Sequence, residues 1–374
     1  MFNRKLAALV AAGAIALAAC SSSSTPAPAA SSGGGGGGGG ATAAPSFVQA
    51  AGCTVGVSWN NYQEERWAKW DEPAIKAGLA AAGAKYISND AKSSADTQTS
   101  NVANLISQGA KVLIVLAQDG TAIKTAVAAA TQAGVPVIAY DRLIEDPNTF
   151  YITFDNVLVG KLQATAVLKA VSKGNFAVIK GNKADANADF LRQGYVQAGV
   201  PDVGQSSADI KIVGETYTDN WDPKNAQTEM EQILTQNQNK IDAVLSENDG
   251  MAGGVVAALT AQGLAGKVPV SGQDGDKAAL NRIALGTQTV DVWKDARLLG
   301  TTAAQVAAQL CNGTKVGSIA GAAPFKTPGG NTINSILLTP DPITKDNLQD
   351  VLAAGWISQA DLCQGVTAGS VKGC

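Results

Sequence analysis

The sequence feature that most constrains the fold is a regular alternation of two kinds of segment. From Cys53 onward, short runs of β-branched and other apolar residues alternate with Ala-rich segments of helical period. Glycines follow the helical segments, where a left-handed residue ends a helix, at Gly83, Gly109, Gly134, Gly199 and Gly263. The alternation is typical of βαβ units and predicts an α/β fold built on parallel sheets.

The apolar runs are predicted to be the strands of these sheets. In chain order they are Thr54–Trp59, Lys85–Ser88, Val112–Ala117, Val135–Tyr140, Tyr151–Phe154, Phe176–Lys180, Ile210–Tyr217, Ala243–Ser246, Val268–Gly272 and Thr289–Trp293. With 374 residues, 45% of them hydrophobic, the chain can bury a large core, and two lobes are expected.

A weak internal duplication also points to two lobes. Val115–Gly120, followed by a helix and by Val135–Ile138, is similar to Val244–Gly250, followed by a helix and by Val268–Ser271. Each half therefore predicts its own α/β lobe. Ligands of open parallel sheets bind beyond the carboxyl ends of the strands, so polar residues that follow strands are candidates for a binding site.

The polar residues at these strand ends are carboxylates, amides, long cations and one tryptophan. They are Asp141, Arg142, Asp185, Asn187, Trp221, Asn248, Asp274 and Lys294. A pyranose needs such a set, because its hydroxyl groups require donors and acceptors and its C–H face packs on an aromatic ring. Asx residues after strands also cap helices, so both interpretations stay open for each of them.

Composition excludes several classes of protein. The sequence has no histidine, which removes the commonest general base and the commonest zinc ligand. A net charge of −3 provides no basic surface for nucleic acid. No G-x-G-x-x-G follows Thr54–Trp59, so the phosphate-binding turn of a dinucleotide enzyme is missing. We expect a binding protein and not an enzyme, with no cofactor and no metal site.

The N-terminus has the pattern of a targeting signal. Arg4 and Lys5 precede an apolar run, Leu6–Ala18, that is too short to span a bilayer comfortably. Leu17-Ala18-Ala19-Cys20 resembles a bacterial lipobox, which implies removal of residues 1–19 and lipidation of Cys20. The alternative is an ordinary secretory signal with an incidental cysteine.

Residues 20–52 are rich in Ser, Pro, Ala and Gly and include the run Gly33–Gly40. We expect them to form a disordered tether between the membrane and the folded lobes. The other cysteines, Cys53, Cys311, Cys363 and Cys374, would lie in an oxidising compartment. The short separation of the last two favours pairing them, which leaves Cys53 with Cys311; four free thiols are the alternative.

Ordered motifs along the chain resemble the periplasmic sugar-binding proteins of ABC importers, the family that includes D-xylose-binding proteins. The motifs are Thr54–Val57, Glu65–Trp67, Ala139–Ile144, Thr153–Asn156, Val159-Gly160, Asn220–Pro223, Asn225-Ala226, Lys240–Val244, Asn248-Asp249, Ala252–Gly254, Ser271–Asp274, Arg282–Ala284, Gly286–Thr289 and Leu337–Pro340. They cover nearly the whole chain after the tether. The Cys set and the C-terminal extension through Cys374 are departures, as is Pro73, which would start the first helix late or kink it.

The resemblance adds Arg66 and Trp67 to the candidate site and implies ligand-binding roles for all of these residues. It implies the type I periplasmic-binding-protein fold, with two doubly wound parallel-sheet lobes joined by a three-crossover hinge. We expect residues 53–154 and 290–327 in the first lobe, and 155–289 and 328–374 in the second. The hinge would close on a monosaccharide, D-xylose before glucose, arabinose or galactose.

These inferences together predict a monomeric lipoprotein on the extracytoplasmic face of the cell membrane. Its partners would be the sugar, the permease and ATPase subunits of an ABC importer, and the membrane that holds its lipid anchor. A lipoprotein that senses another aldose and signals to a membrane receptor is the alternative.

Overall fold

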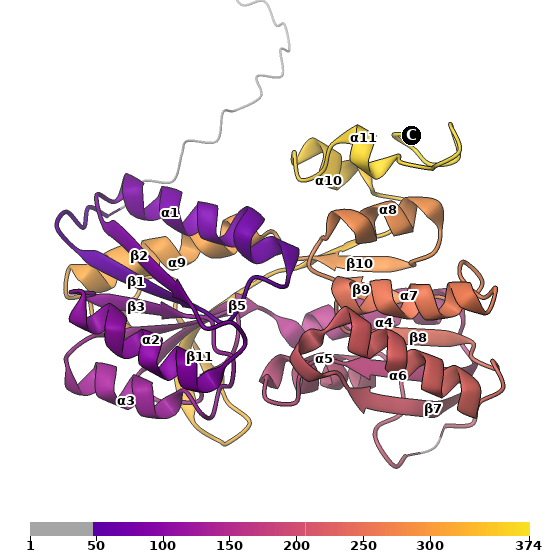
Figure 1. Ribbon diagram of the computed structural model, residues 1–374, viewed down its shortest axis with the longest axis horizontal. Helices are drawn as coiled ribbons and strands as arrows, with labels where there is room; N and C mark the ends of the chain where they lie inside the picture. Colours follow the sequence, from indigo (N-terminus) through magenta and orange to yellow (C-terminus); the bar gives the residue numbers. More distant parts are fainter. Residues whose placement is uncertain (1–47, 206) are drawn as a thin grey trace, which may run out of the picture. The chain divides into compact units, whose positions relative to one another are not determined.

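The computed structural model describes residues 48–205 and 207–374. The predicted signal peptide, Cys20 and the predicted tether up to residue 47 lie outside the described residues. Two α/β lobes are formed, the first mainly from the N-terminal part of the chain and the second mainly from its middle (Figure 1). Among the described helices, none is long and apolar enough to cross a membrane.

The first lobe is a seven-stranded sheet with helices on both faces. Its strand order is β11 (Ala323–Lys326), β12 (Thr332–Leu338), β5 (Thr149–Phe154), β4 (Val137–Tyr140), β3 (Val112–Val115), β1 (Thr54–Trp59) and β2 (Lys85–Asp90). All neighbours are parallel except β11 and β12. One face packs on α1 (Glu72–Ala81) and α9 (Ala296–Cys311), the other on α2 (Ala95–Ser107) and α3 (Lys124–Gln132).

The second lobe consists of two three-stranded sheets that meet at a single bridge between Val244 and Val270. The first has the order β7 (Ile210–Tyr217), β6 (Gly174–Lys180), β8 (Ala243–Ser246), and the second β13 (Asp341–Ile343), β10 (Val290–Trp293), β9 (Ser271–Gln273). The helices of this lobe include two pairs, α4 (Asn156–Ala170) with α5 (Ala186–Gln197), and α6 (Pro223–Gln236) with α7 (Asp249–Ala261). Both pairs cover apolar strand residues.

The remaining helices lie near the crossovers and the C-terminus. α8 (Lys277–Leu285), α10 (Gln349–Ala353) and α11 (Gln359–Leu362) enclose a small core of their own. In Figure 1, α10 and α11 lie next to α8. The short turns Asp219–Trp221 and Val316–Ser318 are 3₁₀ helices.

Three crossovers join the lobes, which confirms the predicted fold class. The chain passes from β5 to α4, from β10 to α9, and from β12 to β13. The structure moves the predicted boundaries of the returning segment at both ends. Residues 290–293 pair with β9 and β13, and β12 pairs with β5, so the segment that returns to the first lobe is 296–338 instead of 290–327. The sequence pattern did not reveal which strands pair with which.

The start of the first lobe also differs from the prediction. Ala50 is buried, and its N–H donates to the carbonyl of Ala82 over 2.7 Å. The side chain of Asn312 donates to the carbonyl of Gln49 over 2.6 Å. Residues 49–52, predicted as the end of the tether, therefore pack against the C-terminal ends of α1 and α9.

Pro73 is accommodated by a wide helical turn. A π-helical turn, Trp67–Asp71, runs directly into α1, and Pro73 occupies the first turn of α1. Proline lacks a backbone N–H, and the first turn of an α-helix tolerates it because an N–H at that position has no acceptor within the helix. The helical segment therefore begins before Pro73 and does not start at this proline. Arg66 lies at its N-terminal end.

Two disulfides close the chain, Cys53–Cys311 within the first lobe and Cys363–Cys374 in the C-terminal segment. The Cα atoms are 6.0 Å and 5.4 Å apart.

Opening the smaller loop by the double substitution Cys363→Ser, Cys374→Ser is expected to lower the free energy of unfolding by about 2 kcal/mol, because the unfolded chain gains loop entropy. Denaturant unfolding measures this change. The control is Ser370→Ala, at an exposed residue of the same loop. A double variant as stable as the control would contradict the prediction.

Candidate ligand-binding site between the lobes

Side chains from both lobes converge on one small cavity of about 20 Å³, roughly the space of a single water molecule. The lining residues are Glu64, Trp67, Asp141, Arg142, Asp185, Asn187, Trp221, Asn248, Gln273, Asp274 and Lys294. Most of them follow the carboxyl ends of strands, as expected for an open parallel sheet.

Two aspartates, one from each lobe, hold corresponding positions in this cavity. Asp141 follows β4 and Asp274 follows β9, at the same place after the Val-Pro-Val motif of each half. Both have a left-handed backbone, with φ of 60° and 104°. Each N–H donates to the adjacent strand, to Ile152 over 2.8 Å and to Val292 over 3.2 Å. Strained non-glycine residues cluster at functional sites, and here the strain points both carboxylates into the cavity.

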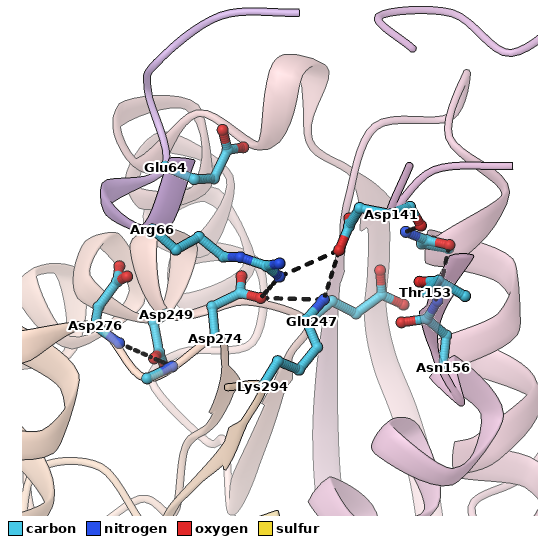
Figure 2. Close-up of polar contacts among 12 residues, drawn as sticks. Glu64, Arg66, Asp141, Thr153, Asn156, Glu247, Asp249, Asp274, Asp276 and Lys294 are labelled. Atoms are coloured by element: carbon cyan, nitrogen blue, oxygen red, sulfur yellow. Dashed lines mark hydrogen bonds and ion pairs between the residues drawn. The ribbon is translucent and has the colours of Figure 1, made fainter. Parts of the chain in front are cut away.

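Two cations bridge these carboxylates (Figure 2). Arg66 Nη1 lies 3.2 Å from both Asp141 Oδ2 and Asp274 Oδ1. Lys294 Nζ lies 3.1 Å from Asp274 Oδ1 and 3.7 Å from Asp141 Oδ2. All four side chains are buried. These two carboxylates and two cations link the lobes.

A second layer of contacts holds Arg66. Asp71 accepts from Arg66 Nε over 2.9 Å and from Nη2 over 2.8 Å, and the Tyr140 hydroxyl donates to Asp71. Burial, partly offset by Arg66, raises the pKa of Asp71 to about 6. The guanidinium is thus oriented from the first lobe before it meets Asp274 of the second.

A second charged group lies beside the first. Arg142 Nε is 3.0 Å from Asp185 of the second lobe, and its Nη2 is 3.6 Å from Glu64. The Trp67 indole N–H donates to Glu64 over 2.6 Å. Burial raises the pKa of both Asp185 and Glu64, and the Arg142 charge only partly opposes it.

Asp141 shows the opposite balance. Burial raises the pKa of this carboxyl, but Lys294, Arg66 and Arg142 together outweigh burial and lower it. Asp141 is therefore an ionised acceptor in neutral solution.

Aromatic rings complete the lining. The Trp221 ring lies flat against Gly181, where a Cβ atom would stand 2.1 Å from the ring. Among the described residues, three polar atoms of the cavity lining are buried without a hydrogen-bond partner: the Trp221 indole N–H, Gln273 Oε1 and Asp141 Oδ2, which has ion-pair contacts only. Buried polar atoms of this kind are rare in folded proteins and are suited to a polar ligand.

The two interpretations of Asx residues at strand ends prove compatible for Asp185 and Asn248. Asp185 caps α5 by accepting from Asn187 N, and Asn248 caps α7 by accepting from Met251 N. Both also line the cavity. Asn187 donates to the Asp141 carbonyl over 3.2 Å and accepts from Asn156 over 3.0 Å, so it joins the lobes at the hinge.

The structure brings all the residues named from the sequence together. All of them line the cavity except Arg66, which lies behind it and contacts Asp141 and Asp274. Sequence reasoning missed Glu64 and Gln273. Gln273 directly precedes Asp274 at a strand end, a signal that could have identified it, whereas Glu64 lies in the loop after β1 and gave no such signal.

Comparisons with known proteins agree with this architecture. Residues 55–315 match the family model described as periplasmic binding protein domain. The D-xylose-binding periplasmic protein of Escherichia coli is 40% identical, over 82% of this chain and 92% of the relative. The multiple sugar-binding periplasmic receptor ChvE of Rhizobium radiobacter is 33% identical, over 85% of this chain and 94% of the relative.

A solved structure shows the same fold. The carbohydrate transporter solute binding protein from Chloroflexus aurantiacus, in complex with D-glucose, superposes with a TM-score of 0.74. It is 29% identical, and the match covers 82% of this chain and 97% of that one. On the family match and the identity to the E. coli relative together, this chain belongs to the periplasmic binding protein family.

Proposed function

We propose that this chain binds a monosaccharide between its lobes, D-xylose before other sugars, and delivers it to an ABC importer. The observation that carries the proposal is the buried pair Asp141 and Asp274, one from each lobe, bridged by Arg66 and Lys294. Carboxylates accept from sugar hydroxyls, and the two cations donate to hydroxyl or ring oxygens. Because two cations face two carboxylates at this position, the group suits a neutral ligand.

The proposed binding of a sugar requires the two lobes to move relative to each other. A cavity of about 20 Å³ cannot hold a pyranose, so the lobes must separate to admit one. Sugar hydroxyls then replace the direct ion pairs between the lobes, and closure over the ring restores a buried site. Trp67 from the first lobe and Trp221 from the second offer aromatic faces for the C–H groups of the sugar.

The relatives support the class of ligand and leave the individual sugar to experiment. The E. coli relative is named for D-xylose, and the Chloroflexus structure holds D-glucose. The name of ChvE as a receptor for several sugars favours a second candidate function, a sensor for another aldose that signals to a membrane receptor. We further propose that the protein is a monomer, that it binds without catalysing a reaction, and that Cys20 carries the lipid that anchors it to the membrane.

Calorimetric titration with D-xylose tests the proposal, with D-glucose, L-arabinose, D-galactose and D-ribose as comparators. We expect one-to-one binding with a Kd near micromolar, about −8 kcal/mol. Preference for another monosaccharide would correct the ligand only. Binding to none of these sugars would refute the proposed function.

The Trp221→Ala variant is expected to bind D-xylose about tenfold more weakly, since the aromatic face contributes roughly 1 kcal/mol beyond its buried area. The same titration measures the change. Val203→Ala is the control, because Val203 is 70% exposed and does not line the cavity. An unchanged Kd in Trp221→Ala would remove this ring from the proposed site.

A further inference from the structure

A third tryptophan, Trp356, connects the C-terminal segment to the first lobe. Its ring stacks on Trp70 with centroids 4.5 Å apart and planes inclined by 19°. It also meets Trp293 edge-on, with centroids 5.4 Å apart. Trp70 belongs to the π-helical turn Trp67–Asp71, which follows Arg66, whereas Trp356 packs in the core formed by α8, α10 and α11. The stack therefore crosses between the lobes.

Trp356 also contacts the loop that carries Asp274. Its indole N–H donates to the Gly275 carbonyl over 2.6 Å, and both groups are buried. Gly275 has φ of 83°, and a Cβ there would stand 2.9 Å from Trp356 Nε1 and 2.5 Å from Trp293 Cδ1. Only glycine fits, so the two rings pack directly on the backbone next to Asp274.

Arg297 reinforces the contact from the first lobe. Its guanidinium lies 5.5 Å from the Trp70 centroid and 5.2 Å from the Trp356 centroid. It donates to the Ala354 carbonyl over 2.8 Å, and Asp295 holds it in place through an ion pair of 2.7 Å. Arg297 lies in the first turn of α9, directly after the second crossover. Arg297 and the rings of Trp70 and Trp356 thus connect three parts of the protein. These are the crossover before α9, the π-helical turn that follows Arg66, and the C-terminal segment.

We propose that Trp356 is a positioning residue that clamps the two halves of the site. It is not one of the lining residues, but it ties the Asp274–Gly275 loop of the second lobe to the turn that begins at Trp67 and follows Arg66 in the first. The clamp favours the closed arrangement in which Asp274 and Arg66 meet. The expected effect on sugar affinity rests on the proposed function. The expected effect on lobe closure rests only on the contact between Trp70 and Trp356.

Two variants separate the two contacts of Trp356. Trp70→Leu removes the stack and leaves the hydrogen bond to Gly275, whereas Trp356→Phe keeps a ring and loses the N–H donor. Each is expected to weaken D-xylose binding about five- to tenfold, with faster release of the sugar. Val371→Ala, a buried residue of the same C-terminal core, is the matched control and should lower thermal stability without changing the Kd.

A sugar-independent readout keeps the clamp testable by itself. Without sugar, small-angle X-ray scattering should give a larger radius of gyration for Trp70→Leu than for the wild type and for Val371→Ala. If both variants bind and scatter like the wild type, the clamp is overturned while the proposed function stands. If the wild type binds no sugar but Trp70→Leu still opens, the clamp stands and the proposed function fails.

Discussion

The Asp274→Ala variant is expected to bind D-xylose at least about 100-fold more weakly than the wild type, because a hydrogen bond to a charged group is worth roughly 1.5–3 kcal/mol and Asp274 is expected to accept more than one. The substitution also leaves Arg66 and Lys294 with Asp141 as their one shared carboxylate in the cavity. Both cations then lose part of the charge that balances them in a buried site. Calorimetric titration measures the loss.

Two further variants test whether the loss of affinity comes from the charge of Asp274. Asp274→Asn keeps the size of the side chain and loses its charge, so its affinity should fall between those of the wild type and Asp274→Ala. Asp222→Asn, which retains a capping side chain at the start of α6, should bind like the wild type. Wild-type affinity in Asp274→Ala, with the fold intact by circular dichroism, would exclude Asp274 from the site.

The free energy of unfolding is expected to fall as the pH rises from 5 to 8, by about 1.4 kcal/mol per pH unit for each proton that only the folded state holds. Beneath the Asp274 loop, the buried side chains of Asp249 and Asp291 both accept from Gly275 N over 3.1 Å. Two buried carboxylates that share one N–H donor repel each other, which favours retention of a proton by the pair.

The charges around this pair agree with a retained proton. Burial raises the pKa of Asp291 to about 8, and the charges of Asp276 and Asp274 add to the rise. Burial and the charge of Asp291 raise the pKa of Asp249, while Arg282 and a hydrogen bond from Gln288 of 2.8 Å lower it.

The direction in which the free energy of unfolding changes with pH follows from these raised pKa values. An unfolded aspartate releases its proton near pH 4, whereas the folded pair keeps one up to about pH 8. The folded state therefore binds more protons in this window, so its advantage is complete below pH 4 and is lost as the pH rises through 8. Asp71, with a pKa of about 6, adds to the fall at the acid end of the window.

Denaturant unfolding across pH 5 to 8 measures this dependence, and Asp291→Asn should flatten its upper part because the amide is neutral at every pH. Asp96→Asn, at an exposed carboxylate in the first turn of α2, is the control and should keep the wild-type slope. A slope in Asp291→Asn equal to that of the wild type between pH 6 and 8 would contradict the proton retained by this pair.

The sequence predicted several strands well, among them β1 and β8, whose residues are almost all buried, and the partly buried edge strand β7. β1, β7 and β8 have the predicted bounds, and the predicted C-terminal glycines of the helices all have positive φ. The C-terminal strands were not predicted. β12 is partly exposed, with Leu337 at 41%, and β13 has three residues including Pro342, so neither has the apolar pattern of a buried strand.

Much of the site was predictable for a topological reason. Side chains that follow parallel strands meet at one edge of the sheet, so Asp141, Asp274 and Lys294 could be named without knowing any contact. Arg66 and Trp67 came from the resemblance alone, because they lie on a helical turn whose direction the sequence pattern does not reveal. The contact between Trp70 and Trp356 depends on how the C-terminal segment returns to the first lobe, which no local pattern encodes.

The central claim is that a monosaccharide binds between Asp141 of the first lobe and Asp274 of the second. A crystal structure of the protein grown with D-xylose tests it most directly. The account predicts one pyranose between the lobes, with hydroxyl groups bonded to Asp141 and Asp274 and a C–H face on Trp221. A sugar bound elsewhere on the protein, with Arg66 and Lys294 still bridging the two carboxylates, would contradict it.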